Sequence, residues 1–72
     1  REAHDGRIQR VDPNLATHPS AQKMLVAHGQ LADFRATYGW VAADGDGLVM
    51  DSASAALLHV SEGDVITRVG RW

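Results

Sequence analysis

The sequence predicts an α+β, β-rich fold: a small, partly open barrel or sheet of about four strands with one short helix. Short apolar runs rich in β-branched or aromatic residues alternate with turn signals, a pattern typical of short strands. One stretch rich in alanine and leucine has the three-to-four spacing of a helix. The chain has 72 residues, of which 44% are hydrophobic, so it can bury one modest core.

The chain is expected to divide at residue 21. Residues 1–21 are interpreted as an N-terminal connecting segment and linker, and residues 22–72 as the small β-rich domain. The polar stretch around Ile8 and Val11 fits a helix or a strand equally well. Both prolines and several turn-forming residues then fall in Asp12–Ala21, the linker itself. Since the chain does not begin with Met, we expect a processed, proteolysed or shortened piece, or a sequence whose start is not included.

Apolar runs predict the strands of the domain. Met24–Ala27 is bounded by polar and glycine residues, as expected of a buried strand. The stretch from Phe34 to Val41 alternates loosely and is rich in aromatic residues, which favours a second strand. Leu48–Met50 and the β-branched Val65–Val69 predict two more strands.

Turn and cap residues separate these strands. Asp44 and Gly45 predict a hairpin turn, because Asp-Gly pairs supply the positive φ angles that tight turns require. Asp51 or Ser52 is expected to cap a helix over Ala53–Leu58 by accepting a hydrogen bond from a backbone N–H of the first turn. The apolar face predicted for this helix consists of Ala53, Ala56, Leu57 and Val60.

A turn at Gly63 and Asp64 follows the helix. Glycine permits the sharp bend, and the carboxylate can accept hydrogen bonds from backbone donors in the turn. This strand–helix–turn–strand unit resembles one found in double-psi barrels and in swapped-hairpin transcription factors. One alternative function is therefore a stand-alone small β-barrel binding or interaction module of the double-psi or swapped-hairpin type.

Composition excludes several function classes. The formal net charge is -2 and the seven basic residues are scattered, so the basic patch of a nucleic-acid-binding protein is missing. No apolar stretch approaches the roughly 20 residues of a membrane span, and no signal peptide is recognisable. The chain has no cysteine, which excludes disulfides and thiolate metal sites. We expect a cytoplasmic protein with neither nucleic-acid nor membrane partners.

No arrangement of residues predicts catalysis or metal binding by this chain alone. The four histidines stand at positions 4, 18, 28 and 59 without the spacing of a ligand pair, so no metal is expected. Ser54 and His59 are too far apart on the predicted helix to share one face. A calcium loop starting at Asp44 would need a carboxylate where Ala55 stands. Dinucleotide and phosphate-binding loops are absent, and no cofactor is expected in this chain.

Asp33 and Arg35 are the candidate substrate-binding residues. They flank Phe34 at the start of a predicted strand, where they can reach a ligand or form an exposed ion pair. The other aromatic predictions are a core position for Phe34 and Trp40 and an interface for Tyr38 and Trp72.

A longer ordered set of residues resembles the C-terminal segment of arginine N-succinyltransferases. His28 stands where an asparagine is usual in that family, and Glu2-Ala3 and Arg7-Ile8 are similar to the segment that leaves its acetyltransferase-type domain. The residues that carry the resemblance are Met24–Ala27, Leu31, Asp33–Thr37, Leu48–Met50, Ala55–Leu57 and Gly63-Asp64.

The resemblance implies a C-terminal portion or subunit of an arginine N-succinyltransferase-like enzyme. Such an enzyme transfers a succinyl group from succinyl-CoA, its co-substrate, to the α-amine of arginine in arginine catabolism. The family's acyl-CoA-binding loop and catalytic histidine belong to the preceding domain, so this chain is expected not to be catalytic alone. Its implied role is structural or pocket-completing. Its implied partner is the catalytic acyltransferase domain or chain of the same enzyme, within an oligomer.

Overall fold

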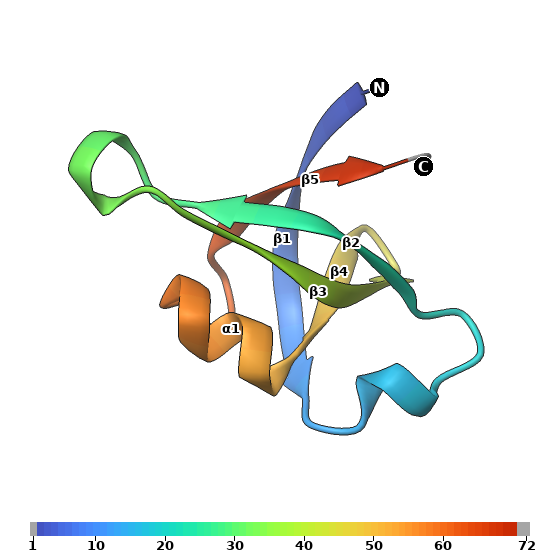
Figure 1. Ribbon diagram of the computed structural model, residues 1–72. Helices are drawn as coiled ribbons and strands as arrows, with labels where there is room; N and C mark the ends of the chain where they lie inside the picture. The colour runs from blue at the N-terminus through green and yellow to red at the C-terminus, as the bar shows by residue number, and fades with distance from the viewer. Residues whose placement is uncertain (1, 71–72) are drawn as a thin grey trace.

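The computed structural model describes residues 2–70 and shows five strands closed into a barrel, with one short helix against it (Figure 1). The order around the barrel is β1-β4-β3-β2-β5, and β5 returns to β1. The prediction of a small β-rich barrel with one helix is confirmed, whereas the open form and the count of about four strands are wrong. The elements are β1 (Glu2–Asp12), η1 (Leu15–Thr17), β2 (Gln22–His28), η2 (Leu31–Asp33), β3 (Arg35–Asp44), β4 (Gly47–Asp51), α1 (Ser52–Leu58) and β5 (Val65–Gly70).

Strand β1 is the one that the sequence leaves undecided, and it closes the barrel. It runs parallel to β4, with Ile8 opposite Leu48, and antiparallel to β5, with Ala3 opposite Val69. Among the side chains of residues 3–12, Ile8 alone is fully buried, which leaves too sparse an apolar pattern to mark a strand. The division of the chain at residue 21 stays a prediction. Strand β1 lies before that residue, and it pairs with β4 and β5, which both lie after it.

The interior of the barrel is filled by apolar side chains from every strand and from α1. The helix follows β4 directly and packs mainly across β3 and β4, as Figure 1 shows. Burial of this apolar surface is the main term that stabilises so small a domain. The buried cluster comprises Ile8, Met24, Val26, Val41, Leu48, Met50, Ala55, Leu58, Val60 and Ile66.

Helix α1 is found where predicted, but it turns a different face to the core. Ser54, Ala55 and Leu58 are buried, whereas Leu57 is 62% exposed. Of the predicted face Ala53, Ala56, Leu57 and Val60, only Val60 is buried, and it lies just beyond the helix. The buried Ser54 lies against Gly39 of β3, where a Cβ would collide with the serine side chain. Because Gly39 has no side chain, the polar Ser54 can occupy a buried position of the helix that the apolar spacing does not predict.

A second, smaller apolar cluster lies outside the barrel. Leu15 of η1 is 1% exposed and packs with Ala42 and Val49, with Trp40 at its edge. The segment interpreted as a linker thus contributes one anchored leucine. Trp40, expected in the core, is half-buried in this cluster.

Candidate functional site

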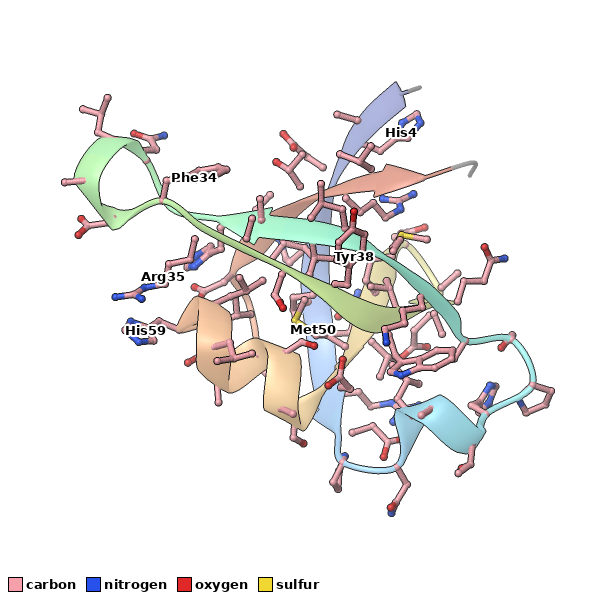
Figure 2. The ribbon with its side chains drawn as sticks, in the orientation of Figure 1. His4, Phe34, Arg35, Tyr38, Met50 and His59 are labelled. Carbon is pink, nitrogen blue, oxygen red and sulfur yellow. The ribbon has the colours of Figure 1, made fainter. Side chains whose placement is uncertain are left out.

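The outer face of β2, β3 and β5 carries apolar side chains that no element of the described chain covers. Leu25 of β2 pairs with Tyr38 of β3 on one side and with Val69 of β5 on the other. Tyr38 is 68% exposed, and Figure 2 shows its side chain standing off the middle of β3. Contiguous exposed apolar side chains on a small domain mark a binding or contact surface.

Two pockets open on this face, one at each end of β2. The first, here called the Asp5 pocket, has a volume of about 330 Å³ and lies where β2 runs into the β2–β3 loop. The second, the Lys23 pocket, has a volume of about 570 Å³ and lies at the other end of the strand. The Asp5 pocket is lined by Asp5, Ala27, His28, Gly29, Gln30, Phe34, Val65 and Thr67. The Lys23 pocket is lined by Gln22, Lys23, Met24, Leu25, Tyr38, Val69 and Gly70.

A fixed carboxylate lies in the Asp5 pocket. Asp5 of β1 is directly opposite Thr67 of β5 in the strand register. The Thr67 hydroxyl donates a hydrogen bond of 2.7 Å to Asp5 Oδ1. No ion pair of Asp5 occurs among residues 2–70, so within that range the carboxylate keeps capacity to accept further hydrogen bonds from a cation.

His28 forms the base of the pocket and ties it to the helix. Its Nδ1 lies 2.9 Å from the Leu58 carbonyl oxygen, to which it donates, and its Nε2 lies 4.0 Å from Asp64 Oδ2. The same Asp64 oxygen accepts a hydrogen bond of 2.9 Å from the Ser61 backbone N–H. Asp64 is thus held by the turn that follows α1, on the side of His28 that faces Ser61.

The β2–β3 loop forms the outer wall of the pocket and protrudes from the barrel (Figures 1 and 2). Gly29 adopts φ +95°, and a Cβ at this position would collide with the Asp33 backbone. Leu31 also has a positive φ, of 54°, and its side chain is 96% exposed. Backbone hydrogen bonds of 3.0 and 3.1 Å close η2, so Phe34 is presented to the pocket from a fixed turn.

The predicted substrate-binding residues lie beside this pocket and not in it. Asp33 ends η2 and Arg35 begins β3, both exposed, and neither lines either pocket. No ion pair between them is found in the described range. Phe34, which they flank, lines the Asp5 pocket and is 58% exposed, so the prediction that it belongs to the core is wrong. A substrate role for Asp33 and Arg35 stays a prediction, and Trp72 lies outside the described residues.

The predicted cap residue Asp51 joins two elements of the fold. Asp51 Oδ2 accepts from the Ser54 N–H at 2.9 Å and its Oδ1 from the Trp40 N–H at 2.8 Å, which joins the start of α1 to β3. The first helical residue is Ser52.

The two predicted glycine turns have positive φ angles. Gly45 has φ +59° in the hairpin, where Asp44 pairs with Gly47 and its carboxylate lies 3.5 Å from Arg10 Nε. Gly63 has φ +92° in the turn that Asp64 ends.

Sequence reasoning does not identify Asp5, Thr67, Gln30 or His28 as site residues. Asp5 and Thr67 are separated by 62 positions and meet only because β1 pairs with β5. No local spacing signals such a pair, since the antiparallel register of strands at opposite ends of the chain decides it. The prediction of Asp33 and Arg35 as substrate-binding residues pointed to the same loop, because these two residues flank Phe34 of the pocket.

Among residues 2–70 no three histidine, cysteine or carboxylate side chains gather where they could hold a metal ion. Within that same range, no helix is both long and apolar enough to span a bilayer.

Comparison with known proteins identifies one family. The family described as the C-terminal domain of the arginine N-succinyltransferase beta subunit matches residues 7–69, which include most of β1, all of β2, β3, β4 and α1, and most of β5. Neither the curated proteins nor the solved structures include a match to the chain. The match covers well over half of the chain, and it agrees with the family that the ordered residues from Met24 to Asp64 resemble. The chain therefore belongs to the family of C-terminal domains of arginine N-succinyltransferase beta subunits.

Proposed function

We propose that this chain is the C-terminal part of an arginine N-succinyltransferase subunit, and that it packs against the catalytic acyltransferase domain or chain and completes it. The family match over residues 7–69 is the observation that carries the proposal. In the proposed reaction, a step of arginine catabolism in the cytoplasm, the succinyl group of succinyl-CoA passes to the α-amine of arginine. Such a transfer needs a neutral amine, a positioned thioester and hydrogen-bond donors to the developing oxyanion. The proposal assigns these groups to the catalytic domain.

Exposed apolar side chains support a packing role. Leu31, Phe34 and Tyr38 are all exposed, and two of them line the pockets of the outer face. Small domains bury a limited share of their own surface and gain stability from a partner that covers such side chains. Burial of a large apolar side chain is worth about 1.5–3 kcal/mol, so coverage of these three residues would contribute to association with the catalytic domain.

The experiment that tests the proposal uses the whole enzyme. Succinylation of arginine by succinyl-CoA is measured with the assembly that contains this chain and with a variant that carries Leu31→Asp and Tyr38→Asp. We expect the double substitution to weaken association with the catalytic domain and to lower activity. The matched control is Leu57→Asp, a leucine that is similarly exposed but lies on α1. The control should leave both association and activity unchanged.

Two results would contradict the proposal. One is arginine succinylation by an enzyme that neither requires nor co-purifies with this chain. The other is a purified chain that stays without an acyl-CoA-binding partner, which would favour the stand-alone barrel module.

A further inference from the structure

We infer that the Asp5 pocket receives the guanidinium group of arginine. The inference rests on the proposed function for the source of that group, free substrate arginine, while the pocket itself is defined by the structure. Its volume of about 330 Å³ is at the lower end of the range for small-molecule pockets, roughly 300–1,000 Å³, and fits one small metabolite or side chain.

The charge of the pocket selects a cation. Asp5 is held in place by the Thr67 hydroxyl at 2.7 Å, and within residues 2–70 it has no cationic partner. A carboxylate oriented in this way can accept two parallel N–H bonds from a planar fork of donors. An anion would be repelled by Asp5, and a divalent metal ion would lack ligands, because a single carboxylate is far short of a coordination shell.

The walls of the pocket select a guanidinium over an ammonium ion. Phe34, which is 58% exposed, supplies an aromatic wall, and Val65 and Ala27 add apolar surface to a lining that is otherwise polar or glycine. A guanidinium is planar and weakly hydrated and stacks on aromatic faces, whereas an ammonium is a strongly hydrated point charge. The side-chain amide oxygen of Gln30 offers a further acceptor at the rim.

The backbone that carries the Phe34 ring is held in place by the turn. Phe34 follows η2, whose conformation is set by the positive φ of Gly29 and by backbone hydrogen bonds within the turn. His28 anchors the start of the same loop to Leu58 of α1. A preformed pocket loses little conformational entropy when it binds, so most of the interaction free energy is expressed as affinity.

The test compares arginine binding by the whole enzyme and by its Asp5→Asn variant, without succinyl-CoA, by isothermal titration calorimetry. We expect Asp5→Asn to weaken L-arginine binding by about 10- to 100-fold, because a charge-assisted bidentate contact is lost. L-citrulline, in which a neutral ureido group replaces the guanidinium, should bind to the unmodified enzyme as weakly as arginine binds to the variant. Asp46→Asn is the matched control, since Asp46 is exposed in the β3–β4 turn and lines neither pocket, and it should leave affinity unchanged.

A second variant and a kinetic measurement keep the inference testable if Asp5→Asn fails to fold. Phe34→Ala removes an exposed ring and should weaken arginine binding by about 2- to 5-fold, the size of an exposed cation–π contact. In the succinylation assay both variants should raise KM for arginine with little change in kcat, and Asp5→Glu should recover part of the loss. Unchanged affinity and KM in Asp5→Asn would overturn the inference and leave the proposed function standing.

Two further results separate the inference from the proposed function. An enzyme that binds arginine through Asp5 but transfers no succinyl group would refute the proposed reaction and support the pocket. A variant with altered assembly of the enzyme but unchanged arginine affinity would place a partner's arginine side chain in the pocket, and would overturn the assignment to substrate.

Discussion

Asp51 serves two elements with one side chain. Its two oxygens accept hydrogen bonds from the backbone of Ser54, in the first turn of α1, and from the backbone of Trp40, in β3. Both contacts are partly buried, so a donor that loses its acceptor there is not fully compensated by water.

Replacement of Asp51 by alanine should lower the free energy of unfolding by about 2 kcal/mol, because an N-cap contributes about 1 kcal/mol and a second, partly buried bond adds about as much. Urea denaturation followed by circular dichroism measures the change. Asp46→Ala, an exposed carboxylate with no such bonds, should change the stability by less than about 0.5 kcal/mol. Equal changes in the free energy of unfolding for the two substitutions would show that the two hydrogen bonds of Asp51 do not stabilise the domain.

The roles of some residues can be predicted from their neighbours in sequence, whereas the roles of others depend on strand pairing in the closed barrel. Caps and hairpin turns depend on a few neighbouring positions, so a turn at Gly45 and a cap at Asp51 or Ser52 could be predicted from the sequence. The candidate site could not, because Asp5 reaches Thr67 through pairing of β1 with β5. The exposure of Phe34 also escaped prediction, since an aromatic ring next to an apolar run is normally buried.

At the level of whole elements, helix α1 depends on a close approach to β3. Ser54 is 5% exposed and lies against Gly39, where any Cβ would meet the serine Cβ at 2.7 Å. The sequence predicted the existence of this helix but not the face that it buries, because the short three-to-four pattern contains alanines on several sides.

Gly39→Ala should therefore destabilise the domain by about 1–3 kcal/mol, the usual cost of overpacking a filled interface. In a background of Ser54→Gly the same substitution should cost measurably less, since the colliding atoms are gone. A double-mutant cycle in urea isolates this coupling. Additive effects of the two substitutions would show that the helix tolerates a shift away from β3.

The β2–β3 loop carries a leucine in a backbone conformation that favours glycine. Leu31 has φ 54° and is almost fully exposed, so its side chain gives the isolated chain no stability in return for the strain. Leu31→Gly should raise the free energy of unfolding by about 0.5–1 kcal/mol. Under the proposed function, the same change should weaken association with the catalytic domain, as sedimentation or size-exclusion measurements would show. A gain in stability without any loss of association would show that the β2–β3 loop is not part of the interface with the catalytic domain.

The closed barrel depends on β1 at the scale of the whole molecule. Ile8 is 1% exposed and packs in the same cluster as residues from all the other strands. Without β1, the outer edges of β4 and β5 would lose their hydrogen-bonding neighbour.

Ile8→Ala should lower the free energy of unfolding by about 2–5 kcal/mol, the range for deletion of buried aliphatic atoms. Because small domains are marginally stable, this loss should leave a measurable unfolded population at 25 °C. Amide dispersion in NMR spectra and urea midpoints report it. Leu57→Ala, at an exposed leucine, is the control and should cost less than about 1 kcal/mol.

The position of β5 in the barrel also affects the order in which the polypeptide acquires structure. Val65–Gly70 lies between β1 and β2, so both of those strands lack one neighbour until nearly the last residue of the described chain has been synthesised. Pairing of Glu2 with Gly70 closes a loop of almost the entire length, and such distant contacts slow the search for the native arrangement. A ribosome-bound chain that ends before Val65 should therefore expose its apolar strands to chaperones, and release of the final strand should trigger cooperative collapse.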